Sequence, residues 1–167
     1  MPARRILQLG DPLLRAVSKP VASPDEAEVT LRDLRATLHE FQRIRGFGRG
    51  ISAVQIGELQ RVIYIEFNSC PYVLLNPEYE WKSEERFILW DDCFSFPDLL
   101  VKVERHTSVG IRYLDEKGKP QELEAEDAFS ELLQHEIDHL DGVLAIDRAI
   151  DKNSFATREE YLRRYGP

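Results

Sequence analysis

Apolar residues recur at helical spacing near the start of the chain. Four of them lie three or four residues apart and therefore share one helix face: Leu31, Leu34, Leu38 and Phe41. Ser23 is followed by Pro24 and then by Glu26, which is the pattern of a capped helix start. Gly46 opens a glycine-rich stretch, which is typical of a helix end. The pattern predicts a long helix between these two points.

The middle of the chain shows the short apolar runs and the alternation that are typical of strands. Four strands are predicted, at residues 61–67, 72–75, 86–90 and 100–104. Residues 108–114 and 121–125 alternate on either side of the turn sequence EKGK, so they are expected to form a hairpin.

A second helical pattern follows the hairpin, over residues 126–140. Its apolar positions spread over a broad arc: Phe129, Leu132, Leu133, Ile137 and Leu140. Such breadth indicates a helix that is buried on most sides. A short helix over residues 157–164 is expected to close the chain. The order of helix, strands and buried helix predicts an α+β fold, and the absence of repeats and linkers predicts one domain, residues 1–167.

Composition adds limits on partners and location. The chain has a net charge of -8, 43% hydrophobic and 31% charged residues, and no apolar run near the roughly 18 residues that span a bilayer. The N-terminus lacks a signal-peptide pattern, and two cysteines do not make a disulfide framework. We expect a soluble cytoplasmic protein with no membrane partner, although the sequence of a mature organellar protein would show the same features. The acidic balance argues against nucleic-acid binding.

The chemistry is concentrated in the buried helix, in the sequence HEIDH at residues 135–139. Residues four apart share a helix face, so His135 and His139 can bind one divalent metal ion. Glu136 lies beside the first histidine, where a carboxylate can take a proton from a water that the metal activates. The motif predicts a metal-dependent hydrolase.

The HEIDH motif alone does not identify the third metal ligand. A metzincin would need a histidine where Ala145 stands, so that class is excluded. A thermolysin-like site would use a later glutamate, and Glu159 and Glu160 are at a suitable distance. Their charged surroundings favour a solvated helix face instead. Cys93 is the other candidate, since a thiolate and two imidazoles make a good tetrahedral site.

Three ordered motifs resemble those of the peptide deformylase family. The family patterns GxGxAAxQxG, EGCxS and HExDHLxG correspond to GRGISAVQIG at residues 48–57, DDCFS at 91–95 and HEIDHLDG at 135–142. The opening ILQLGDPLLR and the pair Asn76-Pro77 also match the family. The resemblance covers nearly the whole chain.

The resemblance implies antiparallel sheets around the helix that carries the motif, and it implies a role for several residues. The metal ligands would be Cys93, His135 and His139, and Glu136 would act first as general base and then as general acid. Gln55 and the backbone N–H of Phe94 would donate to the oxyanion. The substrates would be N-formylmethionyl nascent peptides, and the released product formate. The native metal would be Fe(II), which zinc, nickel or cobalt can replace.

Departures from the family patterns concern the substrate pocket, expected at Gly48, Arg49, Gly50 and Asp92. Asp92 replaces a glycine; it could point to solvent or disfavour acidic substrates. Arg49 replaces a small aliphatic residue. A contact between Arg49 and Glu131 over the pocket mouth is one interpretation, and the sequence favours the other, in which both point to water.

A further departure is Asp91, which replaces a glutamate and is expected to pair with Arg105. The motif at residues 48–57 also departs from its pattern, because Ser52 stands where the family has an alanine.

Other functions remain open from the sequence. One is a deformylase-like hydrolase that acts on a different N-formyl amine, and another is a non-catalytic metal-stabilised module or ribosome-associated factor. The last is a small thermolysin-like peptidase. The resemblance also implies transient ribosome contact through the terminal helix, although residues 158–164 carry mixed charge rather than a basic patch.

Overall fold

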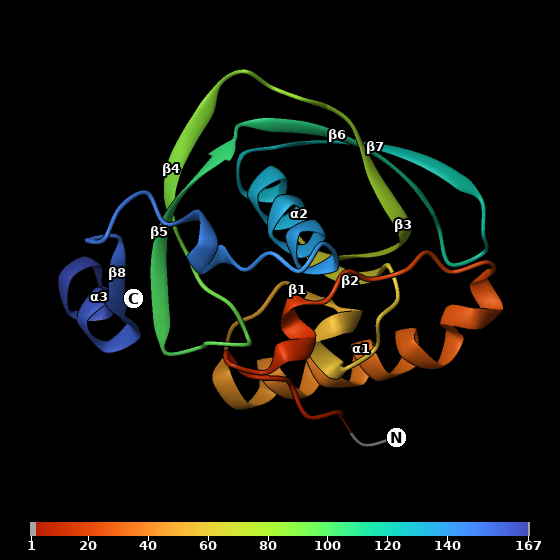
Figure 1. Ribbon diagram of the computed structural model, residues 1–167, viewed down its shortest axis with the longest axis horizontal. Coiled ribbons are helices and arrows are strands. Elements are labelled where there is room, and N and C mark those ends of the chain that lie inside the picture. The colour runs from red at the N-terminus through yellow and green to blue at the C-terminus, as the bar shows by residue number, and fades with distance from the viewer. Residues whose placement is uncertain (1–2, 167) are drawn as a thin grey trace.

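The computed structural model of the chain describes residues 3–166. Helix α2 (Asp127–Leu140) runs through the middle of the molecule, and strands arch over it on one side while helix α1 (Pro24–Arg45) lies on the other (Figure 1). The C-terminal helix α3 (Arg158–Tyr165) lies at the edge, beside the smaller sheet (Figure 1). This arrangement confirms the α+β class.

Two antiparallel sheets surround α2. The larger has the strand order β1-β2-β3-β6-β7, and its strands are Gly50–Ser52, Val62–Phe67, Cys70–Lys82, Ser108–Leu114 and Pro120–Glu126. The smaller has the order β4-β5-β8, formed by Arg86–Asp91, Leu99–His106 and Phe155–Thr157. Short 3-10 helices η1, η2 and η3 span Pro12–Arg15, Ala53–Ile56 and Ala145–Arg148.

The prediction that α2 is buried on most sides is confirmed, because every residue from Phe129 to Leu140 is buried. Its apolar side packs against the inner faces of β2, β3 and β6, where Ile63, Leu74 and Ile111 are fully buried. The polar residues of α2 are therefore held inside the protein on its opposite side. A buried polar residue is stable only with a partner, so this side of the helix is the place to look for a site.

Helix α1 begins and ends where the sequence predicts, but its start is not a capping box. Ser23 makes no side-chain cap hydrogen bond, and Glu26 instead accepts the N–H of Ala22 at 2.7 Å. Gly46 ends the helix with φ = 77°, a left-handed conformation that glycine adopts without strain.

The strands differ from the prediction at three places. Strand β3 is much longer than residues 72–75, because register shifts between Leu75 and Trp81 break its alternation. Strands β1 and β8 were not expected: each has three residues and gains its hydrogen bonds from another strand, β1 from β2 and β8 from β5. No helix within residues 3–166 is long and apolar enough to cross a membrane.

Candidate metal centre

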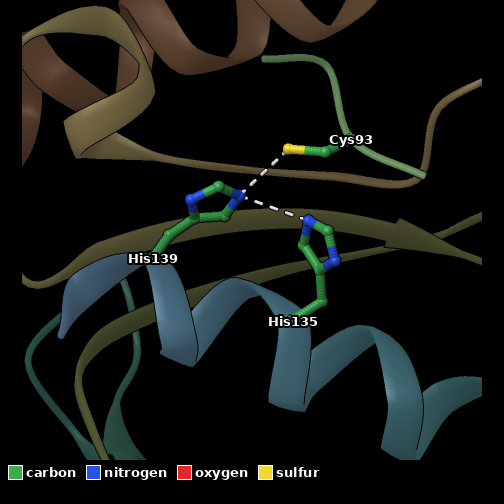
Figure 2. A group of neighbouring side chains, drawn as sticks. All are labelled: Cys93, His135 and His139. Atoms are coloured by element: carbon green, nitrogen blue, oxygen red, sulfur yellow. Dashed lines mark hydrogen bonds between the residues drawn. The ribbon is translucent and has the colours of Figure 1, made fainter. Parts of the chain in front are cut away.

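Three side chains converge on one point beside α2 (Figure 2). His135 and His139 project from the same face of α2, one turn apart, and Cys93 reaches them from the loop that follows β4. The Nε2 atoms of the two histidines are 3.2 Å apart, and Cys93 Sγ lies 3.2 Å from His139 Nε2. All three residues are buried, and their donor atoms lie within 4.8 Å of one another.

These donor atoms fit a divalent metal ion. Ligand atoms at the usual 2.0–2.3 Å from a tetrahedral ion are about 3.3–3.6 Å apart, close to the spacing observed here. The set of one sulfur and two imidazole nitrogens suits zinc or iron. Glu159 and Glu160 do not belong to this group, and Glu160 bonds to Arg163 and Arg164 at 2.6 and 2.8 Å. The geometry therefore brings Cys93, His135 and His139 together as a group that could hold a metal ion.

A chain of buried charges supports His135 from behind. Its Nδ1 lies 3.0 Å from Asp91 Oδ2, so Nδ1 carries the hydrogen and Nε2 is turned toward the metal position. Arg105 donates to Asp91 at 3.0 Å, which confirms the predicted pair, and to Asp138 at 2.6 Å. Asp138 in turn accepts from Arg148 at 2.5 and 2.7 Å.

The two histidines sit in opposite electrostatic environments. Burial lowers the pKa of His135, but the Asp91 carboxylate outweighs burial and holds this pKa well above its usual value. Burial, together with the charge on His135, holds the pKa of His139 well below its usual value. A metal ion binds the neutral form of an imidazole, so metal binding competes with protonation more strongly at His135 than at His139.

Glu136 points into the same region from the next position on α2. Its carboxylate Oε2 accepts a hydrogen bond from Ser52 Oγ at 2.6 Å. Burial raises the pKa of Glu136, and the charge on His135 and the Ser52 hydrogen bond oppose this shift only in part. A carboxylate with a raised pKa is a better proton acceptor than a solvated one. The importance of Ser52 was missed from the sequence, where only its departure from the family alanine marked it.

Gln55 is oriented by its own backbone neighbourhood. Its Oε1 accepts the N–H of Ser52 at 2.9 Å, so its Nε2 must face Ser95 Oγ at 3.3 Å and Cys93 Sγ at 3.6 Å. The amide therefore aims a neutral donor at the metal position. The N–H of Phe94 follows Cys93 directly, and no acceptor within residues 3–166 takes this N–H.

A cavity of about 460 Å³ opens in front of this centre. The structure brings the predicted pocket residues to its wall: Gly48, Arg49, Gly50 and Asp92. Gln55, Cys93, Phe94, His135 and Glu136 also line it, while His139 lies deeper.

Two ion pairs lie at the cavity, and the first corrects the expectation that Arg49 and Glu131 point to water. Arg49 Nη2 donates to both oxygens of Glu131, at 2.9 and 3.0 Å. Glu131 lies one turn before His135 on the same helix face, so its side chain is directed inward and only 6% exposed. Across the cavity, Asp92 accepts from Arg158 at 2.5 Å instead of pointing freely to solvent.

Gly48 leaves space for the Phe94 ring. Its φ is 131°, and a Cβ at this position would lie 2.5 Å from Phe94 Cζ. We expect Gly48→Ala to lower the free energy of unfolding by about 2–4 kcal/mol, from backbone strain and from displacement of the ring. Gly10→Ala is the matched control, because Gly10 also has a positive φ of 107° but open space around it. Equal losses in the two variants, measured by urea unfolding, would contradict a steric role for Phe94.

The chain is similar to known proteins over most of its length. A family model described as polypeptide deformylase matches residues 3–155. A peptide deformylase of Mesorhizobium japonicum is 42% identical over 153 residues, 88% of this chain and 84% of the relative. One from Pseudothermotoga lettingae is 38% identical over 160 residues, 95% and 90% of the two chains.

Solved structures give the same likeness. A peptide deformylase from Synechococcus elongatus in complex with actinonin has a TM-score of 0.85 and 33% identity, covering 99% of this chain and 87% of that one. The peptide deformylase from Thermotoga maritima has a TM-score of 0.84 and 32% identity, covering 90% of this chain and 100% of that one. The residues that the family model matches include α2 and the three donor residues Cys93, His135 and His139.

Proposed function

Since the chain belongs to the polypeptide deformylase family, it removes the N-formyl group from nascent peptides, and we propose that it does so with Cys93, His135 and His139 as metal ligands and Glu136 as the proton-transferring group. The observation that supports this assignment is the convergence of one thiol and two imidazoles beside a buried carboxylate, at the wall of one cavity. This arrangement favours a hydrolase over a non-catalytic binding module, because a metal ion that only stabilises a fold needs no carboxylate beside it.

The metal supplies the part of the chemistry that side chains cannot. A divalent ion acts as a Lewis acid, which polarises a carbonyl and makes water a better nucleophile at neutral pH. We propose Fe(II) as the resident ion, with zinc, nickel or cobalt as replacements. Reconstitution with each ion, under anaerobic conditions for Fe(II), tests this choice by the rate of formate release.

The side chains divide the remaining work between proton transfer and charge stabilisation. Water attacks the formyl carbon while Glu136 takes its proton; the same proton then passes to the peptide nitrogen as the C–N bond breaks, leaving formate and a free N-terminus. Negative charge develops on the formyl oxygen, where Gln55 Nε2 and the N–H of Phe94 would donate hydrogen bonds. Gln55 suits this role because it donates without carrying a charge of its own.

The metal assignment makes a prediction about metal content. We expect Cys93→Ala to weaken metal affinity by at least about 100-fold, because a tetrahedral site loses one of three protein ligands. Glu159→Ala is the control and should bind metal as the wild type does. Metal per protein chain after gel filtration, measured by elemental analysis, checks both. Loss of metal in the Glu159 variant alone would instead support a thermolysin-like site.

The activity itself is tested by formate release from formyl-Met-Ala-Ser, with the protein loaded anaerobically with Fe(II). We expect rapid release that a chelator abolishes and that added metal restores. Bound metal in a near 1:1 ratio without release would contradict the proposed activity but not the metal site.

Location and partners follow from this activity. We propose that the chain acts in the cytoplasm as one domain and meets its formylated substrate at or near the ribosome. The family and the absence of a membrane-spanning helix within residues 3–166 support this setting.

A further inference from the structure

The Arg49–Glu131 ion pair forms a charged wall in the cavity that holds the metal centre. Glu131 comes from α2 and Arg49 from the segment just before β1, so the pair ties the helix to the larger sheet. Leu132 and Phe47 lie in the same cavity. The wall therefore borders the space that a substrate bound at the metal centre would occupy.

Distance along the helix indicates which part of a substrate meets the wall. Glu131 precedes His135 by four residues, which is about 6 Å along the helix axis. In a formylated peptide the first Cα is two bonds from the formyl carbon, and a methionine sulfur is three bonds further. With the formyl group beside His135 and Glu136, a first side chain of this length that runs along α2 toward its N-terminus reaches the level of Glu131 and Arg49.

The pair keeps unused hydrogen-bonding capacity that faces this space. The guanidinium of Arg49 has five N–H groups. It uses Nη2 for Glu131, and its Nη1 makes one long contact of 3.4 Å with the carbonyl of Ala128. Among residues 3–166 no acceptor takes the Arg49 Nε–H, and the side chain remains 42% exposed at the cavity. The wall can therefore donate a hydrogen bond to a substrate without giving up its ion pair.

We propose that this wall is a specificity-determining element, which favours formyl peptides whose first side chain has the length of methionine and ends in a hydrogen-bond acceptor oxygen. Methionine sulfoxide and glutamine both have this chemistry, and oxidation of a formyl-methionine terminus produces the former. The inference rests on the proposed deformylase activity and adds a substrate preference to it.

The preference follows from what each side chain does to the ion pair. A thioether is a weak acceptor, so a methionine side chain displaces water from Arg49 without replacing the hydrogen bonds that the water made. A sulfoxide or amide oxygen accepts from the guanidinium, and hydrogen bonds with a charged donor are the stronger ones. One such bond changes relative kcat/KM by about tenfold.

The test compares four tripeptides that differ only in the first residue: formyl-methionine, formyl-norleucine, formyl-glutamine and formyl-methionine sulfoxide. Formate release is measured with the metal-loaded wild type and with the double variant Arg49→Leu/Glu131→Leu. The double change removes both charges, because a single change would leave Glu131 buried without a partner. Arg112→Leu/Glu78→Leu removes a matched Arg–Glu pair that is exposed on the larger sheet, with the shortest contact at 2.8 Å. Metal content and thermal unfolding show that each variant is folded and loaded.

We expect the sulfoxide-to-thioether ratio of kcat/KM to fall about tenfold in the Leu/Leu cavity variant, through a gain on formyl-methionine and a loss on the sulfoxide. The Arg112/Glu78 variant should keep the wild-type ratio. The glutamine peptide should follow the sulfoxide peptide, because both side chains end in an acceptor oxygen; a glutamine peptide that follows norleucine would overturn the proposed preference. An unchanged ratio in the cavity variant overturns the inference while leaving deformylation intact. No formate from any peptide overturns the deformylase activity itself.

Discussion

Replacing Glu136 with glutamine is expected to lower kcat for formate release by about 10³-fold, within the range that positioned acid–base groups contribute. The amide has nearly the shape of the carboxylate and can still accept from Ser52 Oγ, now 2.6 Å from Oε2. What it loses is the ability to take a proton from water and return it to the peptide nitrogen. Because the metal ligands are untouched, the metal content should stay at the wild-type level.

The measurement is single-turnover formate release beside elemental analysis of the same sample. Glu124→Gln is the control, since Glu124 is exposed on β7 and far from the cavity lining. If Glu136→Gln retained more than about a tenth of the wild-type rate with full metal, Glu136 would not be the proton-transferring group.

Replacing Arg105 with methionine should cost about 3–5 kcal/mol of unfolding free energy, a large share of a typical total of 5–15 kcal/mol. Arg105 is 2% exposed and donates to both Asp91 and Asp138. Its removal leaves both buried carboxylates without this partner, although His135 still faces Asp91 and Arg148 still faces Asp138. The same positive charge helps to hold the pKa of Asp91 below its usual range against the effect of burial.

Urea unfolding of the metal-loaded protein measures this loss. Arg86→Met is the matched control on the neighbouring strand, because Arg86 is half exposed and meets Glu104 only at 3.4 Å. Exposed pairs contribute about 0–1 kcal/mol. If Arg105→Met lowered the unfolding free energy by less than about 1 kcal/mol, Arg105 would not be what stabilises the buried carboxylates of Asp91 and Asp138.

The sequence predicted the helices and the pairing of the two histidines on α2 well, because both depend on local spacing. The i,i+4 placement of His135 and His139 and the broad apolar arc of α2 are properties of a single segment. Cys93 could be assigned only through its motif, since its contact with His139 spans 46 positions. The Asp91–Arg105 pair was likewise found from motif positions rather than from physical spacing.

What the sequence could not give was the direction of polar side chains that meet across segments. Arg49 and Glu131 are 82 positions apart, and each alone is typical of a solvated surface residue. Only the packing of α2 under the larger sheet turns Glu131 inward. Strands β1 and β8 were missed for the same reason, because three residues carry no period and become strands only through their partners.

The short strand β8 also joins the end of the chain to the chemistry. It pairs with β5 from Leu99 to Val101, and the next residue, Arg158, bonds to the carbonyl of Pro97 at 2.6 Å and to Asp92 at the cavity. A chain cut before residue 155 would bare the backbone of β5, and an uncovered strand edge recruits other chains. Trimming residues 155–166 would therefore lower yield through aggregation and remove Arg158 from the cavity lining, so this segment contributes to the enzyme and is not a dispensable extension.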